Sequence, residues 1–296
     1  MLTARRALVL LLAATTALTP ARAEVQTLSL YQKTARSLLV VRARSVSDST
    51  RRPSLQVLEV IKGSYSAPSV TIVPHFEDHT KPTPWLRREV FRKGEESILF
   101  LTPYVDEFGR DAGPEAFAVL HAADGKMEIP PEGSDALLAA VRRFVAILAR
   151  KDLESQERDL RGLLGEPNPL MIEAGLAECT RLRLAIAEDI PALLALLSQR
   201  RPELRAGAVA LMAQVISDSR AAGRDLPDRP MVHQRISALA RLDGDEAVRL
   251  SSVAGLAALG DQTAISLLEQ VGREDPSQSV RYAAQVAAWR LRGTSP

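Results

Sequence analysis

The apolar positions of the chain follow two different periods, which divide it into two regions. Between Val25 and about Ile129, short apolar or alternating runs end at Gly, Pro or Asp residues. These runs predict β-strands over residues 37–46, 55–61, 69–73, 97–102, 116–121 and 126–129. Short strands separated by turn residues are typical of an antiparallel barrel or sandwich.

After Gly133 the apolar spacing becomes helical. Residues 134–148 predict a helix with the spacing i, i+3, i+4, and the charged stretch 150–161 predicts a solvated helix or a connector. The rest of the chain repeats. Four segments align at Ile172, Leu204, Val248 and Val280, which are separated by 32, 44 and 32 residues. The longer step predicts an insertion, which we place at residues 217–229.

Such a period predicts an α-solenoid, in which each pair of helices buries its apolar face only against neighbouring pairs. We expect each aligned helix to pair with the one that follows it, in the segments 191–197, 231–242 and 262–271. In the clearest repeat, Leu256 and Leu259 should be buried.

The first 23 residues have the layout of a secretory signal peptide. Arg5 and Arg6 precede an apolar stretch over residues 7–18, and Ala21 and Ala23 form a small-x-small cleavage site. The mature chain should therefore begin at Glu24 and be periplasmic or secreted; the alternative is a buried first helix. No later run approaches the roughly 18 apolar residues of a transmembrane helix, so none is expected in the mature chain.

Composition and charge narrow the function classes. Of the 296 residues 46% are hydrophobic and 25% are charged, which is typical of a globular protein. The formal charge of +2 comes from 38 basic and 36 acidic residues, and loss of Arg5, Arg6 and Arg22 leaves 35 minus 36, or −1. Nucleic-acid binding requires a basic excess, so we expect no nucleic-acid partner. The single cysteine, Cys179, excludes an intrachain disulfide. We expect it to be a small buried side chain; the alternative is a reactive thiol, which would require a His or basic neighbour positioned to lower its pKa.

Two resemblances to known families follow from short motifs. The segments Leu58-Glu-Val-Ile-Lys-Gly63, Lys93-Gly-Glu-Glu-Ser-Ile-Leu-Phe-Leu101 and Asp124-Gly-Lys126 resemble a bacterial secreted module similar to the OB-like barrel of netrin and metalloproteinase-inhibitor domains. The chain departs from that module at Arg42, where many members have Gly, and the resemblance implies a fold and a compartment, not a chemistry. Residues 245–260, with Asp245, Val248 and Arg249, resemble the HEAT-repeat signature.

Catalytic motifs are scarce. His75 and His79 bracket two carboxylates, but Phe76 stands where a helical zinc motif has Glu, and nearby prolines argue against a helix. A solvated loop is one interpretation of this segment, and a metal site is the other. The chain lacks the usual serine-nucleophile, phosphate-loop and dinucleotide motifs, and we expect no cofactor.

The sequence therefore predicts an α+β protein made of a signal peptide (1–23), an OB-like antiparallel β-barrel (24–132), a helical connector (133–165) and a HEAT-like α-solenoid (166–296). We expect an exported, non-catalytic binding or assembly protein with a protein partner; the alternative is a metal-binding protein or metallohydrolase that uses His75 and His79. His233, Ser237 and Arg241 recur at helical spacing and are the predicted partner-binding residues, unless they form an ordinary solvated face.

Overall fold

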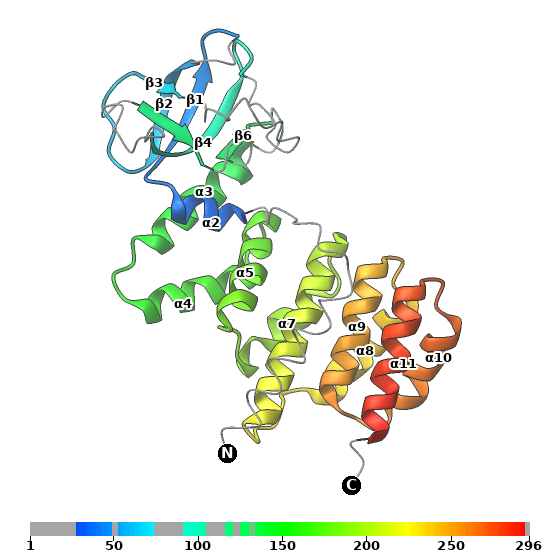
Figure 1. Ribbon diagram of the computed structural model, residues 1–296. Helices are drawn as coiled ribbons and strands as arrows, with labels where there is room; N and C mark the ends of the chain where they lie inside the picture. The colour runs from blue at the N-terminus through cyan, green and yellow to red at the C-terminus, as the bar shows by residue number, and fades with distance from the viewer. Residues whose placement is uncertain are drawn as a thin grey trace.

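The computed structural model describes residues 28–48, 53–73, 91–104, 116–120, 125–130, 132 and 134–293 (Figure 1). The predicted signal peptide and the pair His75 and His79 lie outside the described residues and stay predictions. Within the described part, a β-barrel is followed by a long series of helices, so the protein is of the mixed α+β class.

Six strands of the described residues form one sheet, and five of them close into a barrel. The sheet order is β1-β2-β3-β5-β4-β6, and the additional pairing of β1 with β4 closes the ring. Each strand overlaps a run that alternation predicts. The strands are β1 (Leu39–Ser45), β2 (Ser54–Lys62), β3 (Ser69–Ile72), β4 (Glu96–Pro103), β5 (Ala116–Val119) and β6 (Lys126–Glu128).

The barrel is mixed, so the prediction of a purely antiparallel barrel is wrong. β3 and β5 run parallel, with Thr71 opposite Ala116 and Ile72 opposite Phe117. Alternation along one strand indicates which side chains are buried, but it contains no information about the direction of a strand that is distant in sequence. That direction depends on how the sheet closes. Here closure pairs β3 with β5 in parallel, and a hairpin cannot connect two parallel strands.

Strand β1 is buried on both faces because the barrel and a helix cover it. Leu39, Val41 and Ala43 lie in the barrel core, whereas Val40 packs on the outer side with Phe100 of β4. That outer cluster includes residues of helix α3 (Ser134–Leu148), namely Leu137, Leu138 and Val141. The first helix after the barrel is therefore fixed to the barrel wall.

Helix α2 (Leu30–Arg36) was missed by the pattern analysis. Its seven residues are too few to show a helical period, but Ser29 and Gln32 form a capping box at its start. At its end, the Lys62 ammonium donates hydrogen bonds to the carbonyl oxygens of Thr34 and Ser37, both at 2.6 Å. The end of strand β2 therefore fixes the C-terminus of α2.

Gly63 allows this close connection. Its φ is +86°, and a Cβ at this position would lie 2.7 Å from the carbonyl oxygen of Leu38. Both features exclude a larger side chain. The Lys-Gly step of the predicted barrel motif thus has a structural role.

The remaining helices form two rows (Figure 1). α5, α7, α9 and α11 stand side by side in one row; α6, α8 and α10 pack on α7, α9 and α11, respectively, and α4 packs on α5. The helices are α4 (Leu153–Gly162), α5 (Pro169–Leu182), α6 (Ile190–Leu196), α7 (Pro202–Ala221), α8 (Arg229–Leu242), α9 (Glu246–Leu259), α10 (Ala264–Glu274) and α11 (Gln278–Gly293).

The helices pair differently from the expectation. α8 packs on α9 and α10 packs on α11, whereas we expected α7 with α8 and α9 with α10. Short connections at residues 243–245 and 275–277 bring the paired helices together. Part of the predicted insertion at residues 217–229 extends α7, which has 20 residues against 14 in α9.

The predicted core of the clearest repeat is confirmed, because Leu256 and Leu259 are 0% and 1% exposed. Within the described ranges, each helix is either too short or too polar to span a bilayer.

Candidate binding surface

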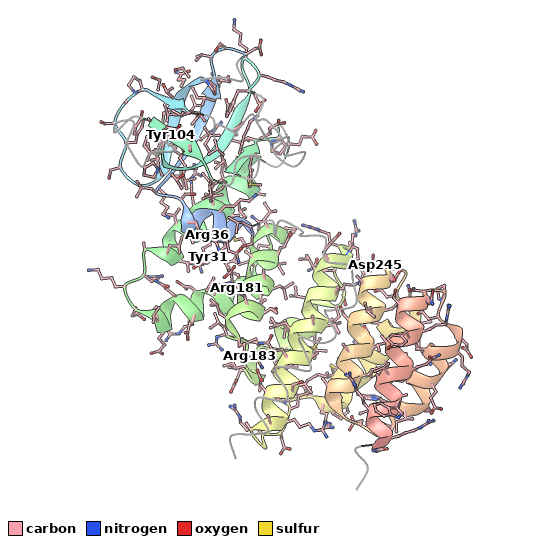
Figure 2. The ribbon with its side chains drawn as sticks, viewed as in Figure 1. Tyr31, Arg36, Tyr104, Arg181, Arg183 and Asp245 are labelled. Carbon is pink, nitrogen blue, oxygen red and sulfur yellow. The ribbon has the colours of Figure 1, made fainter. Side chains whose placement is uncertain are left out.

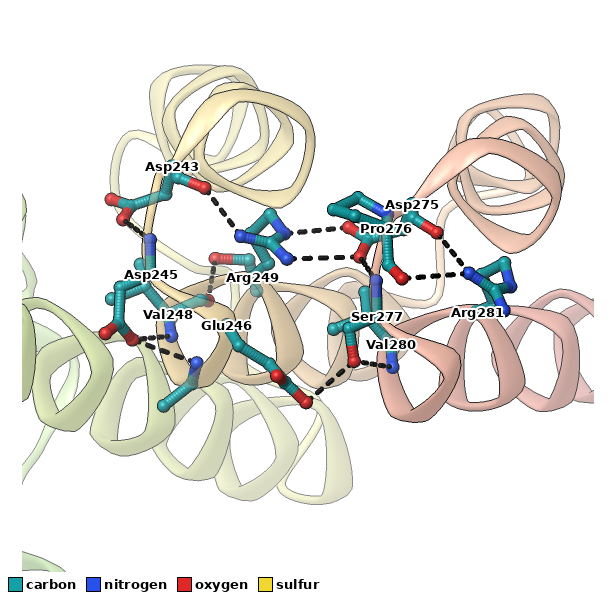
Figure 3. Close-up of polar contacts among 12 residues, drawn as sticks. Asp243, Asp245, Glu246, Val248, Arg249, Asp275, Pro276, Ser277, Val280 and Arg281 are labelled. Atoms are coloured by element: carbon teal, nitrogen blue, oxygen red, sulfur yellow. Dashed lines mark hydrogen bonds and ion pairs between the residues drawn. The ribbon is translucent and has the colours of Figure 1, made fainter.

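Arginine and aspartate side chains connect successive helices of the main row. Arg205 of α7 donates its Nε and Nη2 to Asp243, at 2.8 and 2.7 Å. Arg249 of α9 repeats this arrangement with Asp275, at 2.8 and 3.1 Å (Figure 3). Each aspartate lies in the connection that leads into the next helix of the row, so the ladder fixes how neighbouring helices are placed.

The second rung of this ladder is buried. The side chains of Arg249 and Asp275 are 9% and 4% exposed. Burial alone would raise the pKa of Asp275, but the hydrogen bonds from Arg249 and from the backbone N–H of Ser277 outweigh it and lower that pKa. Asp275 is therefore a stable carboxylate partner at neutral pH.

The ladder ends at α11. Arg281 donates Nη1 to the carbonyl oxygens of Asp275 and Pro276, and no acidic side chain of the described residues forms an ion pair with it. Next to it, Gln285 occupies the position that Val253 has in α9, and it donates to the carbonyl oxygen of Gly272 at 2.8 Å. This side of α11 therefore carries polar side chains where α9 has the apolar Val253.

The described residues leave one face of α7, α9 and α11 uncovered, and we call it the open face. It consists of the residues two, six and nine positions after the aligned Leu204, Val248 and Val280, a spacing that places them on one side of each helix. All of them are exposed or half-buried. They are Ala206, Ala210 and Ala213 on α7, Leu250, Ala254 and Ala257 on α9, and Tyr282, Val286 and Trp289 on α11.

The open face is apolar, with small side chains on two helices and aromatic side chains on the third. Tyr282 and Trp289 are 68% and 72% exposed, and Leu250 beside them on α9 is 38% exposed. Stacking of a further helical pair would involve the neighbouring side of α11, where Arg281 and Gln285 lie. The aromatic residues therefore lie on a different side of α11.

The matching face of α5 is covered by the chain itself. The equivalent positions are Ala174, Glu178 and Arg181. Ala174 is 3% exposed and belongs to an apolar cluster that includes Tyr31 of α2 and Phe144 of α3. Glu178 is fully buried: it accepts a hydrogen bond from Ser29 at 3.4 Å and two from Arg181, at 2.9 and 2.6 Å. Figure 2 shows Tyr31 and Arg181 close together where α2 meets α5.

The open face is continuous across three helices, because α7, α9 and α11 pack on one another along their lengths.

The structure does not bring the predicted partner-binding residues together on one exposed surface. His233 and Ser237 of α8 are half-buried, and His233 Nε2 and Ser237 Oγ are buried without a hydrogen-bond partner among the described residues. Arg241 is exposed. Whether they contact a partner stays a prediction.

The sequence pattern did not predict the open face, because the predicted binding residues all came from the polar side of one helix, α8. The available signal was the repeat alignment, which places Tyr282 and Trp289 at positions equivalent to Leu250 and Ala257.

Two other predicted features can be placed. Cys179 is fully buried, and burial followed by the nearby Asp189 raises its pKa to about 12, so its expected structural role is confirmed. The predicted alternative metal residues, His75 and His79, lie outside the described residues. In the part of the chain that the structure describes, no group of three or more His, Cys, Asp or Glu residues is arranged to hold a metal ion.

Comparison with protein-family models, with curated proteins and with solved structures finds no match to this chain.

Proposed function

We propose that this protein is an exported, non-catalytic binding or assembly protein whose helical array presents a surface to a protein partner. In this proposal the signal peptide is removed, and the mature chain acts in the periplasm or outside the cell. The barrel is an OB-like module and the helices are HEAT-like repeats. A closed ring of five strands supports the first assignment, and aligned helices at a 32-residue step with a recurring Arg–Asp rung support the second.

The open face carries this proposal. Tyr and Trp are enriched in the centre of protein interfaces, where they supply large contact areas at a low cost in conformational entropy. Tyr282 and Trp289 are more than two-thirds exposed and lie on the apolar open face. The equivalent surface of α5 is covered by other helices of the chain, which supports a binding role for the open face on α7, α9 and α11.

Quantitative affinity capture tests the proposal. The mature chain and its double variant Tyr282→Ala with Trp289→Ala would be immobilised, exposed to an envelope extract and compared by mass spectrometry. Loss of two interface aromatics should lower capture of the specific partner at least about tenfold, since each such residue commonly contributes more than 1 kcal/mol.

Two further variants serve as controls in that experiment. Leu153→Ala removes an exposed apolar side chain, 74% exposed, from α4 and should leave capture unchanged. His233→Ala with Arg241→Glu tests the surface of α8. Equal capture by the wild type and the open-face variant would contradict the proposal for this surface, and loss with the α8 variant alone would place the partner there.

A further inference from the structure

Resting on the function proposed above, we infer that the open face binds an amphipathic α-helix of another protein, with the acidic flank of that helix over the C-terminal ends of α7 and α11. Three observations carry this inference: the helices that cover the equivalent surface of α5, the side chains of the open face, and the charges at its rim.

The chain contains an example of the proposed contact. At the start of the main row, α2 lies on α5 next to Ala174 and Glu178, the residues equivalent to Ala206 and Ala210 of α7. Tyr31 belongs to the apolar cluster that contains Ala174 together with residues of α3 and α4, and Ser29 donates a hydrogen bond to Glu178. Helices are therefore suitable covering elements for this side of the row, and no helix of the described residues covers the same positions of α7, α9 and α11.

The side chains of the open face suit an elongated occupant that can approach closely. The positions on α7 and α9 are mainly alanine, which allows a close approach of a helix, and Tyr282 and Trp289 form a row of large side chains along α11. An amphipathic helix can cover an apolar strip of this kind with its own apolar residues, which is a common mode of peptide recognition.

Charges at one rim specify the flank of the bound helix. α11 contains three arginines and no acidic residue. Arg292 is paired with Glu269 of α10, whereas Arg290 forms no ion pair with any described residue. Arg220, near the end of α7, packs against Gly260 at the end of α9. Asp218 and Asp261 at the same end are paired with Arg183 and Arg229. Arg220 and Arg290, which form no ion pair with a described residue, would therefore be complementary to acidic side chains on the bound helix.

Fluorescence anisotropy with designed peptides tests the inference. Three labelled peptides of about 16 residues would share one composition of Leu and Ala: one with a Leu stripe at i, i+3, i+4 and Glu on its flank, one with the same stripe and Lys, and one with Glu and a scrambled stripe. We expect the Glu-flanked amphipathic peptide to bind at least tenfold more tightly than the other two, and more weakly as salt increases.

Variants separate the apolar and the charged contributions. Tyr282→Ala with Trp289→Ala should weaken binding of the Glu-flanked peptide at least tenfold, and Arg220→Glu with Arg290→Glu should reverse the preference between Glu and Lys flanks. Leu153→Ala should change neither. Equal affinity for the scrambled peptide, a preference for Lys in the wild type, or a concentration-dependent dimer that Trp289→Ala abolishes in sedimentation would overturn the inference.

The two proposals fail in different ways. If the peptides show no preference while the open-face variant still loses its captured partner, the inference of an acidic helix is wrong and the binding function stands. If the open-face variant retains its partner as well, both are wrong.

Discussion

Removing the Asp275 carboxylate tests whether the buried rung holds the helical array together. Asp275 accepts hydrogen bonds from Arg249 Nε at 2.8 Å, from Arg249 Nη2 at 3.1 Å and from the backbone N–H of Ser277 at 2.8 Å. Asp275→Ala would leave a guanidinium that is 9% exposed without its carboxylate. Breaking a buried pair in this way costs about 3–5 kcal/mol, because the remaining charge is buried without compensation.

Urea unfolding followed by circular dichroism measures this loss. Asp218→Ala is the matched control: Asp218 pairs with Arg183, but their side chains are 44% and 63% exposed, so the loss should be below about 1 kcal/mol. Replacing both members of the buried rung with apolar residues, as Arg249→Met with Asp275→Leu, should be less destabilising than Asp275→Ala alone. A loss from Asp275→Ala no larger than that of the control would refute the structural role assigned to the rung.

The remaining predictions concern the pH dependence of the buried rung, the core, the cysteine and the N-terminus. Below about pH 4, the difference in the free energy of unfolding between the wild type and Asp275→Ala should become smaller. The pKa of Asp275 is lowered in the folded state, so its carboxylate stabilises the fold above the unfolded-state pKa and loses that contribution as it is protonated. A constant difference in urea titrations down to about pH 2.5 would contradict this. Leu256→Ala should cost about 2–5 kcal/mol in urea unfolding, since Leu256 is fully buried, and a loss below about 0.5 kcal/mol would mean that the repeat register is misplaced. Cys179 should resist iodoacetamide in the native protein and react in urea, because the thiolate is the reactive form and burial raises its pKa to about 12; fast native labelling would be inconsistent with its buried position. Intact-mass analysis of exported protein should give Glu24 as the first residue, and a retained Met1 would exclude cleavage.

Local patterns located most of the elements, because burial on one face imposes a period on the sequence. The strands of the barrel and the long helices α7, α9 and α11 were found in this way. Helix α2 was not, because a helix of seven residues between flanking loops has no complete period, and its capping residues Ser29 and Gln32 were the available signal.

Contacts between distant segments could not be predicted from periodicity. The parallel pairing of β3 with β5, the pairing of α8 with α9, and the cover that α2 gives to α5 all depend on tertiary packing. The same limit explains the missed open face. Trp289 is exposed because of the arrangement of the helices around α11. The helical pattern alone places both His233 and Trp289 on the polar sides of their helices, so it does not distinguish the two surfaces.

Site-specific photo-cross-linking tests the central claim, that the open face is a protein-binding surface, most directly. A photoreactive amino acid would replace exposed Ala254, at the centre of the open face, or exposed Arg241 on α8. We predict that irradiation of source cells gives a discrete cross-linked species with the probe at position 254 and not at position 241. Cross-linking from position 241 alone, or from neither position, would contradict the claim.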